Sequence, residues 1–168
     1  MDDADGIIRK TGDTYEIVFR RRLAKPIEKV WAALTVPERI GDWLAEATIE
    51  PDLRVGARFA LHFPTMGYRM VGEIVVLEPP RVIAWTWPDP KALERRSVVT
   101  FALAPDGAGC ILTLTNDGLI KPDLEDVAAG WHTHLECLPG AAEGVHTPWS
   151  AEREKVHAAR YRNFVESL

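Results

Sequence analysis

The sequence lacks most of the features that mark specialised protein classes. Its two cysteines, Cys110 and Cys137, form no CxxC or zinc-type spacing, so we expect reduced, partly buried thiols rather than a disulfide framework. Glycine and proline number 12 each among 168 residues, too few for a collagen-like or disordered chain. No window approaches the roughly 18 apolar residues of a membrane span. These absences favour an ordinary globular protein without a membrane span.

Signals for targeting, nucleic-acid binding and common catalytic chemistry are also missing. The start of the chain is acidic and has no basic stretch followed by an apolar one, so we expect no signal peptide and a cytoplasmic location. The net charge of −5 argues against a nucleic-acid partner, which needs a basic face. There is no glycine-rich phosphate loop, GxSxG or HExxH motif. The sequence therefore gives no support for a cofactor, a metal or a named catalytic centre.

The first part of the chain predicts a strand, two short helices and then more strands. A length near that of one domain indicates a single domain over 14–168, preceded by a flexible lead-in at 1–13. Alternation from Thr14 to Leu23 predicts a strand, and helices begin at Pro26 and at Pro37, the second ending at Leu44. A period of two then predicts six strands, separated by Pro, Gly and Asp turns, at 46–50, 57–63, 68–78, 81–88, 95–103 and 109–117.

A helical period returns in the last third of the chain. Asp123 is a suitable N-cap for a helix of four or five turns, which Pro139-Gly140 should end or kink. The tail at 141–168 contains a loop and a further helix capped by Ser150, and its docking stays open.

These elements predict an α+β fold in which a curved seven-strand antiparallel sheet wraps around the long helix that carries Trp131. A sheet of this size must twist, and its apolar concave face must be covered. The long helix is the one element able to lie across it, while the two short helices seal one end. A curved sheet and a helix often leave space between them, so we expect an apolar molecule to bind there.

An ordered set of motifs resembles the SRPBCC (START-like, helix-grip) superfamily, and within it the branch named after the activator of heat-shock-protein-90 ATPase. The resemblance covers about 14–140 and departs from the usual pattern at Ala57 and Cys110. The motifs are 26–35 with Pro37 and Trp43, Gly56-Ala57-Arg58-Phe59, Gly72-Glu73-Ile74, Glu78-Pro79-Pro80-Arg81, Thr86-Trp87, 99–103, 112–115 and Gly130-Trp131.

This resemblance implies the helix-grip fold but several functions. The superfamily includes carriers of lipids, sterols, plant hormones and polyketides, together with some cyclases and aromatases. The eukaryotic namesake of the branch stimulates a chaperone ATPase with the help of an additional N-terminal domain. Only 13 residues precede the first predicted strand here, so membership alone does not make the protein a co-chaperone or a stress-response factor.

Residues that share the presumed concave face, or that flank it on the long helix, are the candidates for the cavity wall. Aromatic and methionine side chains at strand period are more often core than ligand contacts, and that alternative stays open for all of them. The candidates are Phe59, Leu61, Phe63, Met70, Ile74, Trp87, Phe101, Trp131, His134 and Leu135.

Charged and polar residues near this face leave further alternatives. His132 and His134 are two apart on one helix, so their side chains point about 200° apart and cannot share a metal. His134 could form an acid–base pair with Glu136 or Glu73. We expect Glu73 and Arg69, which alternate with the cavity set, to lie on the outer face of the sheet.

We therefore expect a non-catalytic protein that binds a small hydrophobic molecule. The first alternative is an interaction protein acting on a heat-shock-protein-90-type chaperone, with an exposed patch at Trp85 and Trp87 as a contact for that partner or for a homodimer. The second alternative is a cyclase- or hydrolase-type enzyme that uses His134.

Overall fold

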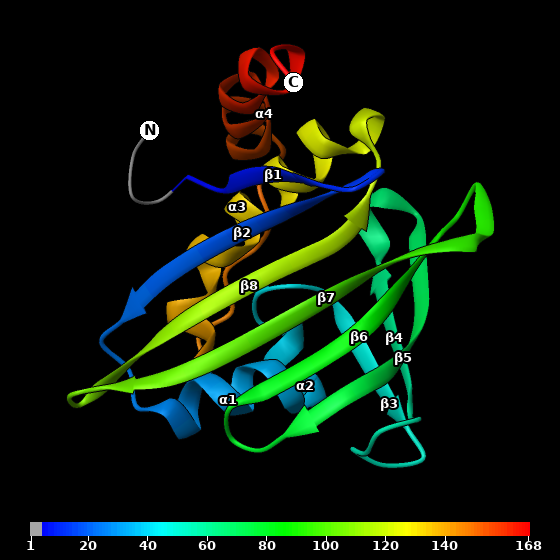
Figure 1. Cartoon of the computed structure of the whole chain (residues 1–168). Helices are drawn as coiled ribbons and strands as arrows, with labels where there is room; N and C mark the ends of the chain where they lie inside the picture. The colour runs from blue at the N-terminus through cyan, green and yellow to red at the C-terminus, as the bar shows by residue number, and fades with distance from the viewer. Residues whose placement is uncertain (1–4) are drawn as a thin grey trace.

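One antiparallel sheet carries most of the structure (Figure 1). The computed structural model describes residues 5–168, with Leu93 described by its backbone alone. Its strands are β1 Ile7–Thr11, β2 Thr14–Leu23, β3 Glu46–Glu50, β4 Arg58–Phe63, β5 Tyr68–Glu78, β6 Val82–Asp89, β7 Ala92–Asp106 and β8 Gly109–Leu119. Within residues 5–168 they form a sheet of eight strands in the order β1-β2-β8-β7-β6-β5-β4-β3.

In the described part of the chain, four α-helices accompany the sheet: α1 Ile27–Thr35, α2 Pro37–Gly41, α3 Leu124–Ala141 and α4 Ala151–Glu166. Short 3₁₀ turns occupy Pro64–Met66 and Lys121–Asp123. Figure 1 shows α1, α2 and α3 behind the curved sheet, with α4 beside β1. The predicted α+β helix-grip fold is confirmed, although the sheet has eight strands instead of seven.

The extra strand lies in the segment predicted as a flexible lead-in at 1–13. Residues 1–4 of that segment lie outside the described residues, but Ile7–Thr11 pairs with β2 in register Ile7↔Val18. Gly12 has a φ of 64°, a left-handed backbone that suits glycine in the turn between Thr11 and Thr14. Ile8, only 4% exposed, anchors the strand in the core. The prediction of a flexible lead-in was wrong, because within Ile7–Thr11 only Ile8 is buried and one buried side chain gives no alternation to recognise.

Period-two alternation places one face of each central strand in the core. Along the first part of β8, Cys110, Leu112, Leu114 and Asn116 are buried, with partly buried residues between them. Phe101 on β7 pairs with Leu114, so the buried faces of the two strands are continuous. The opposite face is exposed at Arg69 and Glu73, as predicted.

The helix α3 covers this layer and runs further than predicted. Pro139 removes one backbone donor, yet the helix continues to Ala141. Leu138 and Ala141 are both fully buried, and their packing offsets the lost hydrogen bond near the helix end. The second short helix, α2, is shorter than predicted and ends at Gly41 instead of Leu44.

The tail docks on the outer side of α3 through α4. Ser150 accepts a hydrogen bond from the backbone N–H of Arg153 and so caps α4, as predicted. The α4 side chains that reach inward, His157 and Tyr161, are 7% and 3% exposed. No helix among residues 5–168 is long and apolar enough to cross a membrane.

Candidate ligand cavity

The centre of the space between sheet and helix is filled by aromatic rings. Trp85 stacks on Phe59 at 4.4 Å and on Phe101 at 5.4 Å between ring centroids, and Trp43 meets Phe101 edge-on at 5.9 Å. This packing closes the middle of the concave face. Six of the predicted cavity residues lie within this core, each at most 2% exposed, and do not reach open space: Phe59, Leu61, Met70, Ile74, Phe101 and Leu135.

Open space remains at one end of the sheet, as a cavity of about 370 Å³. Its walls come from the end of β6 and the start of β7, from the end of β8, and from the N-terminal half of α3. The remaining predicted residues line it, namely Phe63, Trp87, Trp131 and His134. Further lining residues are Leu44, Met66, Tyr68, Asn116, Val127, Gly130 and Glu154.

The cavity wall is largely aromatic, and hydrogen bonds hold its rings in place. Trp87 meets Trp131 edge-on at 5.8 Å and lies 6.1 Å from Phe63. The indole N–H of Trp87 donates to Tyr68 Oη at 3.0 Å, and that of Trp131 donates to Asn116 Oδ1 at 2.9 Å. Because both indole donors have partners, the rings present their apolar faces and edges to the cavity.

None of these further lining residues was predicted for the cavity wall, although the sequence carries a signal for two of them, Tyr68 and Asn116. Tyr68 shares the period-two face of β5 with Met70. Asn116 continues the inward face of Leu112 and Leu114 on β8, where an amide among leucines signals a specific hydrogen-bonding partner.

His134 brings a single polar ring into this wall. It is 6% exposed, and its Nδ1 lies 3.0 Å from the carbonyl oxygen of Trp43. A carbonyl can only accept, so Nδ1 carries the proton and donates it. Burial lowers the pKa of His134, which keeps the ring neutral. Its Nε2 is therefore a free acceptor.

The acid–base pairs considered for His134 do not form. Glu73 is exposed on the outer face of the sheet, and Glu136 instead contacts His157 and Arg153. The structure therefore gives the His134 ring a backbone carbonyl as its partner instead of a carboxylate.

Charges of both signs surround the mouth of the cavity. Asp89 forms an ion pair with Arg95, and its pKa is lowered by the hydrogen bond from the backbone N–H of Lys91 and by Arg95. Glu154, on α4, accepts a hydrogen bond from the indole of Trp149 at 2.6 Å, and burial raises its pKa. Basic and acidic groups thus balance around an apolar interior.

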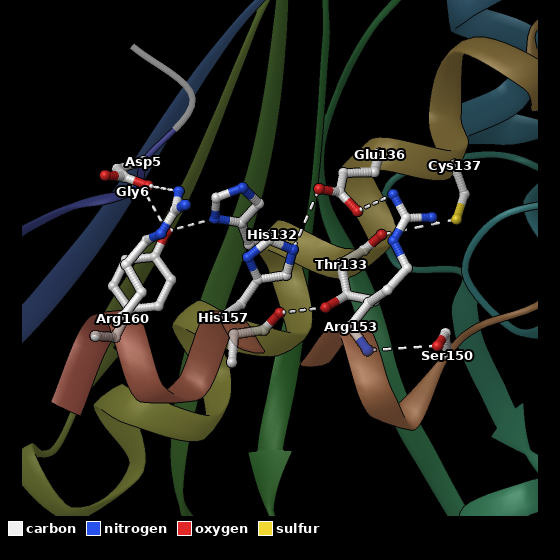
Figure 2. A network of polar contacts seen from close by, with 12 residues as sticks. Asp5, Gly6, His132, Thr133, Glu136, Cys137, Ser150, Arg153, His157 and Arg160 are labelled. Carbon is white, nitrogen blue, oxygen red and sulfur yellow. Dashed lines mark hydrogen bonds and ion pairs between the residues drawn. The ribbon is translucent and has the colours of Figure 1, made fainter. Parts of the chain in front are cut away.

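A second polar cluster lies between α3 and α4, away from the cavity (Figure 2). The rings of His132 and His157 stack with centroids 3.8 Å apart, and His157 Nε2 lies 3.2 Å from Glu136. Arg153 forms an ion pair with Glu136 at 2.5 Å. Among residues 5–168, His132, Glu136 and His157 form a group whose ligand-type atoms lie within 4.8 Å of one another.

Hydrogen bonds within this cluster join the two helices. The N–H of Gly6 donates to Tyr161 Oη at 2.8 Å, and the same hydroxyl is hydrogen-bonded to His132 Nδ1 at 2.8 Å. With that nitrogen occupied and Glu136 bound to Arg153, the group is not arranged as three free metal ligands. As predicted, His132 and His134 point to different partners, so they share no site.

Comparisons with known proteins find one family model and several solved structures of similar fold. Residues 24–143 match the family model described as activator of Hsp90 ATPase homolog 1-like protein. CalU16 from Micromonospora echinospora is 26% identical over 96% of this chain and 98% of its own, with a TM-score of 0.76. The BPP1335 protein of Bordetella parapertussis is 32% identical over 92% and 87% of the two chains, with a TM-score of 0.71. Protein MLL2253 from Mesorhizobium loti is 30% identical over 76% and 96%, with a TM-score of 0.68. No curated protein matches the sequence.

Proposed function

The chain belongs to the family of activator of Hsp90 ATPase homolog 1-like proteins, and from that premise we propose that it binds a small apolar, aromatic molecule in the cavity at the end of its sheet. The observation that carries this proposal is the cavity of about 370 Å³ between Phe63, Trp87 and Trp131. Its volume lies in the range of known small-molecule sites, which are mostly apolar with a few placed polar groups.

The arrangement of polar groups supports binding without chemical conversion. The indoles of Trp87 and Trp131 are hydrogen-bonded within the wall, and the ion pair of Asp89 and Arg95 neutralises charge at the mouth. These contacts orient rings and lower the cost of burying a neutral guest. The His134 ring, which lines the cavity, is paired with a backbone carbonyl and has no carboxylate partner to raise its basicity.

Gly130 offers a direct test, because a side chain added there would enter the cavity. Gly130 lines the cavity from α3, and a Cβ built on it meets no atom within 4 Å. We expect Gly130→Phe to fold normally, since glycine is a poor residue inside a helix, and to weaken the binding of methylnaphthalene at least tenfold. The readout is tryptophan fluorescence, because Trp87 and Trp131 border the guest.

The matched control is Gly41→Ala. Gly41 also has no atom within 4 Å of an added Cβ, but it lies on α2 and does not line the cavity. This variant should bind methylnaphthalene as the unmodified protein does. If the unmodified protein shows no saturable fluorescence change up to the solubility limit of the probe, or if Gly130→Phe binds it equally well, the proposal is wrong.

A protein partner is the second candidate, favoured by the family description over residues 24–143. Trp85 does not supply the exposed patch considered for it, being 1% exposed, and Trp87 faces the cavity. This candidate is tested by adding the protein to a heat-shock-protein-90-type chaperone and measuring the ATPase rate of the chaperone. An unchanged rate would remove the candidate.

We also propose a cytoplasmic location. Cys110 and Cys137 are both free and buried, which fits a compartment that keeps thiols reduced. Fractionation of cells that express the tagged chain would test this location.

A further inference from the structure

His134 places an unused hydrogen-bond acceptor inside the cavity. Its Nδ1–H donates to the carbonyl of Trp43, so Nε2 carries a lone pair. The ring lines the cavity, and Nε2 has no partner among residues 5–168. A polar atom in an apolar site costs binding energy unless the guest supplies its partner.

The neighbours of His134 narrow the choice of that partner. Phe63 meets the imidazole at 6.2 Å between ring centroids, and the indoles of Trp87 and Trp131 also line the cavity. These apolar rings favour a flat neutral guest, and the balanced charges at the mouth select neither a cation nor an anion. A carboxylate has no proton to donate to Nε2. A neutral hydroxyl on an aromatic ring meets each of these conditions.

We propose that His134 selects hydroxylated aromatic molecules by accepting their O–H hydrogen bond at Nε2. The inference rests on the proposed function, since it names the chemical class of guest for the same cavity. It makes His134 a specificity-determining residue, although the bulk of the binding energy comes from the aromatic wall.

The test compares two probes of similar shape, naphthol and methoxynaphthalene. Both have an oxygen on the ring, but only naphthol can donate a proton to Nε2. The affinity ratio of the two probes is measured by tryptophan fluorescence in the unmodified protein and in His134→Phe. Dividing the ratio of the unmodified protein by that of His134→Phe cancels the difference in hydration between the two probes, because this difference is the same for both proteins. We expect the ratio to fall about fivefold in His134→Phe, the effect of one neutral hydrogen bond.

Two further variants show whether the effect belongs to Nε2. His134→Gln offers an amide oxygen as acceptor and should restore part of the preference for naphthol. His62→Phe makes the same substitution at an exposed residue of β4 that does not line the cavity, and it should leave the preference unchanged. Thermal unfolding of each variant shows whether it is folded, and naphthol added to the unmodified protein should raise its Tm.

The outcomes distinguish failure of this inference from failure of the proposed function. If methoxynaphthalene binds but the probe ratio is the same in His134→Phe, the cavity is a ligand site and His134 does not choose the ligand. The inference is also overturned if His62→Phe abolishes the preference as strongly as His134→Phe. If neither probe binds the unmodified protein, the proposed function itself fails.

Discussion

Asn116 shows how one polar residue positions an aromatic wall. It is 3% exposed, accepts the indole proton of Trp131 through Oδ1, and donates through Nδ2 to the carbonyl of Val98 at 3.4 Å. An amide this deeply buried is stable only while its partners are present, so the residue and the ring depend on one another.

We expect Asn116→Leu to lower the free energy of unfolding by about 1 to 3 kcal/mol, because the buried indole N–H of Trp131 loses its acceptor. Urea denaturation measures the change. Trp131→Phe removes the donor, so the double variant should lose less stability than the sum of the two single variants. Strictly additive losses would show that the hydrogen bond contributes nothing.

His132 should make stability depend on pH. Burial, His157 and Arg21 lower its pKa from 6.5 to about 4 in the folded protein. The unfolded chain therefore takes up a proton on this residue below about pH 6.5, while the folded protein does not until about pH 4. Stability from this source is complete above pH 6.5 and is lost as the pH falls towards 4.

The expected loss from His132 is up to about 2 kcal/mol across this window, allowing for partial solvent screening. Denaturation midpoints at several pH values should therefore shift less in His132→Gln than in the unmodified protein. His62→Gln serves as the control, since its ring is an exposed side chain of β4 beside Glu46. A pH profile identical in His132→Gln and the unmodified protein would contradict this account.

At the scale of elements, α4 is held to the rest of the protein by a few buried side chains. Tyr161 joins three segments, because its hydroxyl accepts a hydrogen bond from Gly6 before β1 and shares a second one with His132 on α3. Burial raises the pKa of Tyr161 to about 12, so the hydroxyl stays protonated and can donate. Most other α4 residues are exposed, so this helix depends on few contacts.

We expect Tyr161→Phe to increase hydrogen exchange in α4 and β1 while leaving β7 and β8 protected, because one substitution removes both hydrogen bonds. Exchange followed by mass spectrometry measures this. Tyr68→Phe makes the same chemical change at the cavity and should leave exchange in α4 unaltered. Equal effects of the two variants on α4 would rule out the proposed role of Tyr161.

Elements with strong local signals could be predicted from the sequence, and weakly marked ones could not. Pro and Gly turns delimit the strands from β3 to β8, and the predicted bounds lie close to those observed. However, β7 extends over Ala92–Asp106, because backbone pairs such as Asp106↔Gly109 continue the hairpin beyond its apolar residues. The strand β1 escaped prediction for a related reason, since its stability comes from pairing and from Ile8.

At the scale of the whole molecule, the position of the cavity is set by how three rings meet. Phe59, Trp85 and Phe101 come from three different strands and stack into one column. Period-two alternation places each ring on the concave face, but it does not show that they touch and close its centre. The cavity could therefore be predicted between sheet and helix, while its location at one end of the sheet required the three-dimensional structure.

The cavity and the tail are connected through one helix, because Glu154 borders the cavity and His157 lies three residues further along α4. A guest held against Glu154 should therefore hold the tail in place as well. We expect saturating methylnaphthalene to slow cleavage within α4 by trypsin, which can cut at Arg153 and Arg160. Unchanged cleavage would show that guest and tail are independent.

This connection gives the C-terminal helix a kinetic role. If departure of the guest requires α4 to detach first, the residence time of the guest is governed by breakage of the Tyr161 and His157 contacts. A chain that ends before Ala151, and so lacks α4, would then release the guest much faster while its central strands stay stable.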